Sequence, residues 1–391
     1  MAQSLGQVRR VGVLTGGGDV PGLNVAVKTL ARCLHEQGKE VVGLRRGWAA
    51  LLALGPGCTE PREDWVLPLT PDVVRTIDRT GGTFLHTSRT NPMAVKPPDV
   101  PEQWRSLAPE PGADGKVDLT GAALRGLEDL GLDVLVAIGG DDTLSFARRL
   151  HREGARVLAI PKTMDNDVPG TDYCIGFSTA VTRSVDFIGA LRTPAGSHER
   201  FLVVELFGRN SGETSLISSL LAGVDRALIS EVPFDPDRVA RLLEADRRAN
   251  PSRYAVLTVS EGAHPEGGAC VQGGAADAYG HLKLGGIGRQ VGDFLERATG
   301  IGIMNQSLGY LMRGGPPDTL DRMVATSFGR IAADQAVRGE SGLMVAVRAG
   351  RYALVALEDI GTRKVNVERY YDPFEYRPKM DSVLGLPMFL E

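Results

Sequence analysis

Short apolar runs alternate with amphipathic stretches along most of this chain. The apolar runs are rich in β-branched residues and only five or six residues long, which is typical of strands buried on both faces. The stretches between them repeat apolar residues at helical spacing. In the first half the predicted elements are strand Arg10–Thr15, helix Pro21–Gln37, strand Glu40–Arg45, strand Asp133–Ile138, helix Leu144–Glu153 and strand Ala155–Ile160.

The same alternation resumes after residue 177 and predicts a second α/β lobe. Alternation of strands and helices indicates βαβ units, and therefore sheets that are mainly parallel. Between Asn91 and Gly115, prolines, glycines and charges interrupt all periodicity, which predicts a surface loop. The predicted elements of the second half are helix Ser178–Leu191, strand Phe201–Phe207, helix Ser211–Ala222, strand Arg226–Glu231, helix Pro236–Ala249 and strand Tyr254–Ser260.

Composition narrows the class of protein. With 391 residues, of which 42% are hydrophobic, the chain is long enough for two or three domains with buried cores. A net charge of −4 gives no overall cationic field, so we expect neither nucleic acid nor an anionic membrane as a partner. No apolar run approaches the roughly 18 residues of a membrane span. The cysteines show no CxxC spacing and no signal peptide precedes them, which favours a cytoplasmic protein with reduced thiols.

Two polar runs, Gly139–Thr143 and Pro161–Asp167, follow two consecutive predicted strands. Together they carry four carboxylates and a lysine. Because the carboxyl ends of parallel strands meet at one edge of a sheet, and ligands bind at that edge, we expect these side chains to lie close together.

Asp141 and Asp142 are adjacent carboxylates that repel each other unless a cation compensates their charge. Magnesium is suited to this role, because it is usually held by one or two carboxylates together with substrate phosphates. The alternative is a helix N-cap, since aspartate is favoured there and Thr143 begins a helical pattern.

Asp165 and Asp167 are open to two interpretations, because an Asp-Asn-Asp sequence is also common in turns. Lys162 and Thr163 stand just before them and offer a cation for a phosphate and a hydroxyl group. Asp165 is able to accept a proton from a sugar hydroxyl. Taken together, these residues predict a phosphoryl-transfer site.

A glycine run, Thr15–Asn24, lies between a predicted strand and a predicted helix. Glycines allow backbone amides to approach a phosphate, and the helix N-terminus that follows favours an anion. A tight turn without a ligand is the alternative. The run is neither a Walker A loop nor a dinucleotide fingerprint, because its spacing differs from both.

From Thr15 to Gly315 the chain resembles the phosphofructokinases of the bacterial-type fold, most closely the pyrophosphate-dependent ones. This resemblance implies an α/β fold with two doubly wound, Rossmann-like lobes and a cleft between them. It places the phosphoryl-donor lobe at residues 1–176 plus about 313–362, and the sugar-phosphate lobe at 177–312 plus about 363–391. The motifs occur in the family's order: Thr15–Asn24, Gly81–Arg89, Gly139–Thr143, Pro161–Asp167, Ser197–Arg200, Glu205–Arg209, Ser260–Gly262 and Gly309–Gly315.

The resemblance implies reversible, Mg²⁺-dependent transfer of a phosphoryl group to the 1-hydroxyl of fructose 6-phosphate. It assigns the catalytic base to Asp165, with Arg89 and Thr163 beside it, and magnesium to Asp141 and Asp167. Arg200 is expected from a neighbouring subunit, which implies a homodimer or homotetramer with shared active sites. The remaining implied residues are Gly17, Gly18, Asp142 and Lys162 for the donor, and Thr163, Asp165, Arg200, Phe207, Gly208, Arg209, Glu261, Tyr310 and Arg313 for the sugar phosphate.

Two positions bear on the identity of the donor. Relatives that use nucleotides usually have glycine where this chain has Asp142 and Lys162, and pyrophosphate-dependent relatives show this Asp/Lys pair. A carboxylate in that space repels a longer polyphosphate, whereas the ammonium group favours a short one. We therefore expect pyrophosphate as the donor, with an ATP-dependent 6-phosphofructokinase as the alternative.

Met304 stands where many relatives have an arginine for the sugar 6-phosphate, so reduced affinity for the acceptor is expected.

Other functions fit the chain less well. A non-catalytic sugar-phosphate-binding homologue would lack the base or the metal carboxylate, and both are present. A lipid or NAD kinase shares a Gly-Gly-Asp run but lacks the Asp165 motif and the sugar motifs.

Overall fold

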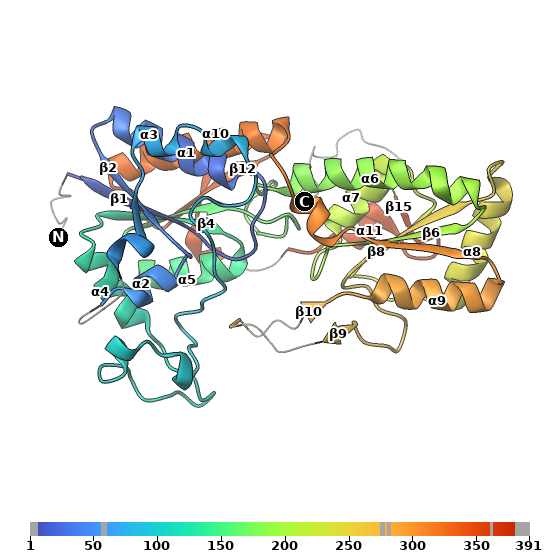
Figure 1. The fold of residues 1–391 in the computed structure, drawn as a ribbon, viewed down its shortest axis with the longest axis horizontal. Coiled ribbons are helices and arrows are strands. Elements are labelled where there is room, and N and C mark those ends of the chain that lie inside the picture. The colour runs from blue at the N-terminus through green and yellow to red at the C-terminus, as the bar shows by residue number, and fades with distance from the viewer. Residues whose placement is uncertain (1–6, 56–60, 274–277, 280–282, 360–362, 380–391) are drawn as a thin grey trace.

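Two α/β lobes lie side by side along the long axis of the molecule (Figure 1). The computed structural model describes residues 7–55, 61–273, 278–279, 283–359 and 363–379. Each lobe is built on a sheet whose central strands are parallel, so the predicted α/β class is confirmed. Within the described ranges, none of the helices has both the length and the apolar character that crossing a membrane requires.

The first lobe contains a seven-stranded sheet in the order β13-β12-β5-β4-β1-β2-β3. Its strands are parallel except at the two edges, where β3 and β13 run antiparallel to their neighbours. Every residue of β4 and β5 is buried, which explains why these strands are continuously apolar in sequence. The strands are β1 (Arg10–Thr15), β2 (Glu40–Leu44), β3 (Val66–Pro68), β4 (Val134–Gly139), β5 (Val157–Pro161), β12 (Leu343–Arg348) and β13 (Arg351–Ala356).

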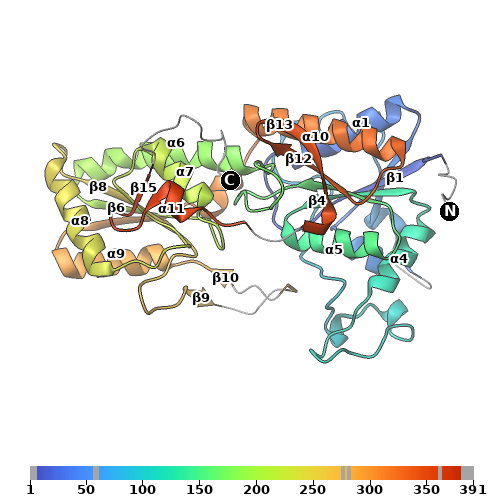
Figure 2. The same ribbon diagram turned by 180° about the vertical axis from the view of Figure 1, so that it is seen from behind.

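Helices cover both faces of this sheet. Figures 1 and 2 show α1 and α10 on one face and α2, α4 and α5 on the other. On the second face, Trp48 packs edge-on against Phe146 of α5, with 4.9 Å between ring centroids. The helices of this lobe are α1 (Leu23–Glu36), α2 (Ala49–Ala53), α3 (Pro71–Val74), α4 (Thr120–Asp129), α5 (Asp141–Arg152) and α10 (Thr319–Arg338).

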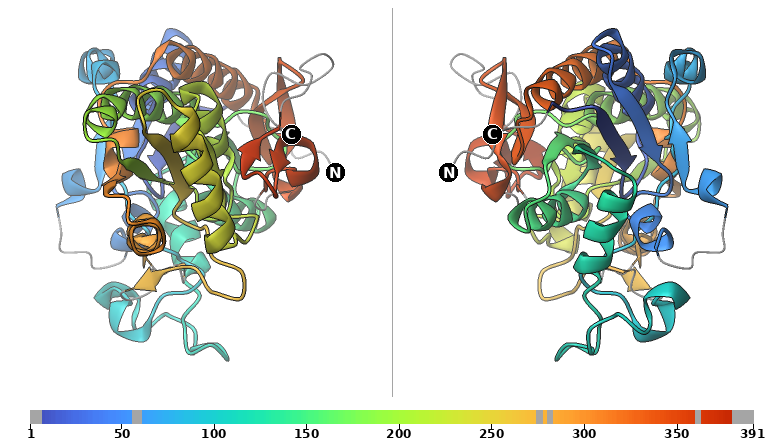
Figure 3. Two further views of the ribbon diagram at one scale, coloured as in Figure 1. Left: turned by 90° about the vertical axis from the view of Figure 1, so that its right-hand side faces the viewer. Right: turned by 90° about the vertical axis from the view of Figure 1, so that its left-hand side faces the viewer.

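The second lobe contains a smaller, four-stranded parallel sheet in the order β11-β6-β8-β7. Helices α6 and α7 pack on one face, and α8 and α9 on the other, as the view along the long axis shows (Figure 3). The elements are α6 (Phe177–Ser197), β6 (Phe201–Leu206), α7 (Glu213–Ala222), β7 (Arg226–Leu228), α8 (Pro236–Ala249), β8 (Ala255–Ser260), the pair β9 (Gln272–Gly273) and β10 (Lys283–Leu284), α9 (Ile287–Thr299) and β11 (Ile303–Ser307).

The chain crosses between the lobes more than once. After the second sheet it returns to the first lobe through α10, β12 and β13. It then crosses back, and a short segment with α11 (Val367–Tyr370), β14 (Tyr371–Asp372) and β15 (Arg377–Pro378) packs on the second lobe. There the Tyr371 hydroxyl donates to the carbonyl of Ala227 at 2.5 Å. The last residues of the chain, 380–391, lie outside the described ranges.

The segment 91–115 differs in part from the predicted surface loop. It holds no long helix or strand, as predicted, but Trp104 in its middle is only 2% exposed. The indole Nε1 donates a hydrogen bond of 2.7 Å to the carbonyl of Leu52 in α2. The composition of this segment, which is typical of a loop, therefore did not indicate that Trp104 is buried and attaches the segment to the first lobe.

Replacing Trp104 by alanine is expected to lower the free energy of unfolding by about 3–5 kcal/mol, because it leaves a large cavity and removes one hydrogen bond to the carbonyl of Leu52. Urea unfolding followed by circular dichroism measures this change. Leu107→Ala serves as the control, since Leu107 on the same segment is 53% exposed. Equal stability of the two variants would contradict the anchoring role.

Candidate active site

The two polar runs at the ends of β4 and β5 come together as the sequence predicts. Gly139 pairs with Pro161 in parallel register, so the runs leave the sheet at the same level. Helix α5 begins at Asp141, and its N-cap residue is Gly140, which has no side chain to cap with. The N-cap alternative is therefore wrong, and both aspartates lie in the first helical turn, where the helix dipole favours negative charge.

Asp165 lies in an environment that disfavours its charge. Its Oδ1 atom is buried and accepts no hydrogen bond from the described residues. Burial raises the pKa of this carboxyl to about 7, and the nearby charge of Glu261 adds to the effect, whereas Arg209 and Arg313 oppose it. The backbone N–H of Asp165 donates to the Thr163 hydroxyl at 3.2 Å, which closes a tight turn.

Asp167 and Asp141 lie near Asp165 and interact with it electrostatically. Burial, Asp165 and Asp141 together raise the pKa of Asp167. No group of three or more His, Cys, Asp or Glu side chains in the described part of the chain could hold a metal by itself. A site with two carboxylates, completed by phosphate oxygens and water, is nevertheless what Mg²⁺ commonly uses. The donor set formed by Asp141 and Asp167 fits that ion, because it supplies hard oxygen ligands.

Lys162 connects this edge to the glycine loop. It is only 3% exposed, and its Nζ donates to the carbonyl of Gly18 at 2.6 Å. Burial, with the charge of Arg313 as a second cause, lowers the pKa of its ammonium group to about 8, whereas Asp19 and Asp141 favour the charged form. Gly17 has a φ of +75°, and a Cβ placed there would lie 3.4 Å from Lys162 Nζ. A buried cation therefore lies directly beneath the glycine loop.

The segment that carries Arg89 packs along the other side of the glycine loop. The N–H of Gly17 donates to the carbonyl of Ser88 at 3.3 Å, and the Thr87 hydroxyl donates to the carbonyl of Gly17 at 2.6 Å. Arg89 itself is exposed, and its charge acts on Glu261 of the second lobe. Arg89 therefore faces the region between the lobes.

The residues expected on the sugar side gather at the carboxyl edge of the second sheet. Phe207, Gly208 and Arg209 follow β6, and Glu261 follows β8. The Ser260 hydroxyl donates to the carbonyl of Gly208 at 2.7 Å, which ties the two strand ends together. Burial raises the pKa of Glu261 to about 7, while Arg209 is the main opposing charge.

Arg313 reaches from this side to the glycine loop. Its guanidinium stacks on Tyr310 at 4.6 Å and on Phe207 at 5.4 Å from the ring centroids. Its Nε lies 3.7 Å from Oδ1 of Asp19 in the first lobe. A Cβ placed on Gly18 would lie 2.7 Å from Arg313 Nη1. Arg313 therefore bridges the two predicted halves of the site, and sequence reasoning missed its partner Asp19.

Arg200 and Met304 stand apart from this assembly. Arg200 precedes β6 and Phe207 follows it, so the strand separates them by about 20 Å at 3.3 Å per residue. Within one chain Arg200 is therefore remote from the other candidate residues. Met304 lies within β11 and packs against the hydrophobic core.

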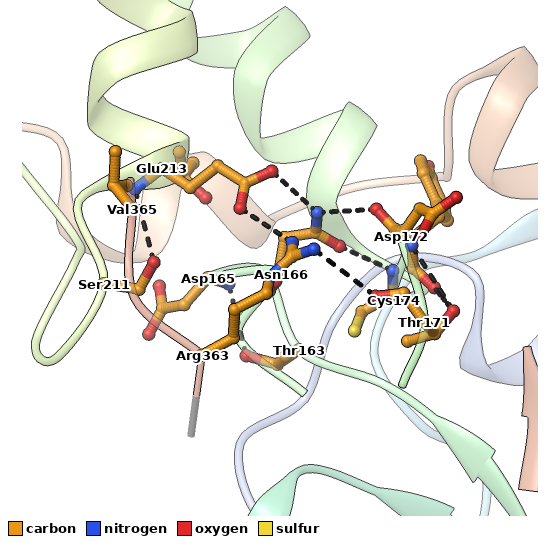
Figure 4. A network of polar contacts seen from close by, with 12 residues as sticks. Thr163, Asp165, Asn166, Thr171, Asp172, Cys174, Ser211, Glu213, Arg363 and Val365 are labelled. Carbon is orange, nitrogen blue, oxygen red and sulfur yellow. Dashed lines mark hydrogen bonds and ion pairs between the residues drawn. The ribbon is translucent and has the colours of Figure 1, made fainter. Parts of the chain in front are cut away.

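Sequence reasoning also missed a buried polar network next to Asp165. Figure 4 shows Asn166, Glu213 and Arg363, which come from three distant parts of the chain, joined by hydrogen bonds. Asn166 belongs to the predicted motif, and Glu213 stands four residues after Arg209. Arg363 carried no signal in the sequence, because no motif or periodicity surrounds it.

The fold and the polar edges of its two sheets define a two-lobed α/β protein with charged loops at facing strand ends. Residues 10–336 match the family model described as Phosphofructokinase. The chain belongs to the phosphofructokinase family.

Individual relatives agree with this assignment. The chain is 40% identical over 365 residues to the pyrophosphate–fructose 6-phosphate 1-phosphotransferase of Amycolatopsis methanolica, covering 92% of this chain and 97% of the relative. It is 37% identical over 352 residues to ATP-dependent 6-phosphofructokinase 3 of Streptomyces coelicolor, covering 90% of this chain and 94% of the relative. A crystal structure of the pyrophosphate-dependent phosphofructokinase of Marinobacter aquaeolei shares the fold, with a TM-score of 0.74, 17% identity, and 96% of this chain and 89% of the other covered.

The raised pKa of Glu261 predicts that its ionised carboxylate lowers the free energy of unfolding, by an amount that depends on pH. The folded state binds the Glu261 proton more tightly than the unfolded state, whose pKa is near 4.5. The contribution of Glu261 to stability is therefore most favourable below about pH 4.5 and is lost as the pH rises toward 7. Glu261→Gln is expected to be more stable than the unmodified protein by roughly 1–2 kcal/mol at pH 8, and equally stable near pH 4.5.

Chemical denaturation at the two pH values, without sugar phosphates, measures this difference. Glu296→Gln, at an exposed position on α9, is the control and is expected to change little at either pH. A Glu261→Gln variant that is less stable at pH 8 would show that its pairing with Arg209 outweighs the burial of its charge.

Proposed function

We propose that this protein transfers a phosphoryl group from pyrophosphate to the 1-hydroxyl of fructose 6-phosphate, and that it catalyses the reverse reaction as well. The observation that carries this proposal is Asp165, whose buried Oδ1 accepts no hydrogen bond from the part of the chain that the structure describes and whose pKa is raised to about 7. A general base requires a free oxygen and a pKa near the working pH. The name of the relative from Amycolatopsis methanolica describes the same activity.

In this reaction Asp165 accepts the proton of the sugar 1-hydroxyl. The sugar oxygen forms a bond to the nearer phosphorus of pyrophosphate, and the bond from that phosphorus to the bridging oxygen breaks, which releases phosphate. Arg89 stabilises the negative charge that spreads over the transferred group in a loose transition state. The Thr163 hydroxyl, which already holds the N–H of Asp165, orients the reacting turn.

Asp141 and Asp167 are the residues that we propose to hold Mg²⁺. When bound, the ion neutralises charge on the phosphate oxygens and orients the donor. Asp165 stands beside both carboxylates, and the mutual repulsion of the three groups is relieved by a cation.

The donor pocket is proposed to lie between the glycine loop and the first turn of α5. Gly17 and Gly18 shape one wall, and Lys162 provides a buried positive charge beneath them. Asp142 lies in the first turn of α5, where its carboxylate repels a longer polyphosphate chain. These charges favour pyrophosphate, and ATP is the alternative donor, as in the relative from Streptomyces coelicolor.

The sugar phosphate is proposed to bind against Phe207, Gly208, Arg209, Glu261, Tyr310 and Arg313. In this division, residues 1–176 and about 313–362 form the donor lobe, and residues 177–312 and about 363–391 form the sugar lobe. Arg200 lies at the amino end of β6, opposite the carboxyl edge that carries the other residues, and is proposed to serve the site of a neighbouring subunit, which requires a homodimer or homotetramer.

A coupled assay for fructose 1,6-bisphosphate, with pyrophosphate or ATP as the donor and Mg²⁺ present, tests the function. Turnover with pyrophosphate is expected, and Asp165→Asn is expected to lower kcat by about 10³-fold, because the base is lost. Asp186→Asn, at an exposed position on α6, is the control and should retain full activity. Absence of product with either donor would refute the proposed function.

Donor choice is tested by replacing Asp142 and Lys162 with glycine together. The ratio of kcat/KM for ATP to that for pyrophosphate is expected to rise by at least about tenfold, because repulsion between two charges 4 Å apart is on the order of 1–4 kcal/mol. Steady-state kinetics with each donor measures this ratio. An unmodified protein that uses ATP in preference to pyrophosphate would contradict the assignment of these two residues.

A further inference from the structure

The turn that carries Asp165 and Asp167 is held by the side chain between them. Asn166 is fully buried and has a φ of +52°, a left-handed conformation that asparagine tolerates better than most residues. Its Nδ2 donates to the carbonyl of Asp172 at 2.9 Å and to Glu213 Oε1 at 2.8 Å. Its Oδ1 accepts from the N–H of Cys174 at 2.7 Å. The amide of Asn166 therefore has partners on both sides.

Arg363 binds the backbone of the same turn. Its Nη2 donates to the carbonyl of Asn166 at 2.7 Å, and its backbone N–H donates to the carbonyl of Asp167 at 2.6 Å. The same Nη2 lies 2.8 Å from Glu213 Oε2, so one guanidinium joins the turn to this carboxylate (Figure 4). The side chains of Arg363 and Glu213 are 15% and 3% exposed, respectively.

These groups come from three separate parts of the chain. Asn166 follows β5 of the first lobe, Glu213 is the first residue of α7 in the second lobe, and Arg363 lies on the segment that returns to the second lobe. Next to Glu213, the Thr214 hydroxyl donates to the carbonyl of Met164 at 2.5 Å. The N-terminus of α7 therefore holds the Asp165 turn at two points.

Glu213 and Arg363 depend on each other. Burial raises the pKa of Glu213, and the charge and hydrogen bonds of Arg363 oppose this rise, as does the hydrogen bond from Asn166. Loss of one member leaves the other as a buried charge without its counter-ion, which is strongly unfavourable. The pair therefore acts as a unit.

We infer that Glu213 and Arg363 are positioning residues, which fix the direction of the Asp165 carboxylate by holding Asn166 from the second lobe. Neither side chain is proposed to contact a substrate. Because Asn166 lies between the two aspartates of the turn, a small rotation of Asn166 redirects both carboxylates at once. The expected effect on catalysis rests on the proposed function, whereas the ordering of the turn by Glu213 and Arg363 does not depend on it.

The test compares Arg363→Met with Lys364→Met, a matched change at the neighbouring exposed residue. In Arg363→Met we expect kcat to fall about 100-fold, because misplacement of a catalytic group by about 1 Å has an effect of this size. KM for both substrates is expected to change by less than about threefold, since no binding group is removed. Lys364→Met is expected to match the unmodified protein.

Rescue separates positioning from a general loss of structure. Arg363→Lys keeps a positive charge and a hydrogen-bond donor but loses the planar guanidinium group, so we expect its kcat to lie between those of Arg363→Met and the unmodified protein. Added guanidinium ion is expected to raise kcat of Arg363→Met and to leave Lys364→Met unaffected. Should Arg363→Met fail to fold, Glu213→Gln replaces it, with an expected fall in kcat of about tenfold. Unchanged kcat, or a loss that appears only in KM, would overturn the inference.

Hydrogen exchange of residues 163–175 gives a readout that does not depend on activity. Faster exchange in Arg363→Met than in Lys364→Met, including at the Cys174 amide, is expected because Asn166 loses the hydrogen bond from Arg363 that helps to hold it in place. Equal exchange in the two variants would overturn the ordering role. If the unmodified protein makes no fructose 1,6-bisphosphate with either donor, the proposed function fails, and the exchange experiment still decides the positioning of the turn.

Discussion

Burial of acidic side chains between the two lobes is the constraint on which the rest of this structure depends. Asp165, Asp167, Glu213 and Glu261 come from both lobes, and burial is the largest cause that raises the pKa of each. The opposing cations also come from different parts of the chain, with Arg209, Arg313 and Arg363 as the principal ones. The relative position of the lobes therefore sets the charge state of the site.

The carboxylates fall into two groups that differ in how their oxygens are paired. Glu213 lies in a network in which Asn166 and Arg363 each bind one of its oxygens. Asp165, which precedes Asn166 in the chain, keeps one buried oxygen without a hydrogen bond from the described residues. An unpaired buried acceptor lowers stability, and such groups concentrate where a protein binds or transforms a ligand. The hydrogen-bonded Glu213 thus stabilises the turn that carries Asp165, and the unpaired oxygen of Asp165 remains available to a ligand.

Much of the fold was predictable because its signals are local. Strand β1 and helix α8 have the predicted bounds, and the polar runs after β4 and β5 lie together because parallel strands end at one edge. The errors also have local causes. Helix α5 begins three residues earlier than predicted, since the apolar pattern starts only at Leu144 whereas the first turn holds the two aspartates. Trp104 was missed because a single buried aromatic residue leaves no periodic trace in a segment rich in proline and charge.

By itself the sequence determined the order of strands and helices, their burial, and the kinds of side chain placed at the strand ends, because hydrophobic period and turn chemistry act over a few residues. Only the tertiary structure decided which of these side chains meet. Arg363 binds the carbonyl of Asn166 across 197 residues of chain, and Arg313 reaches Asp19 in the glycine loop near the start of the chain. Such pairs leave no local pattern, since their geometry exists only once two independently wound sheets have packed against each other.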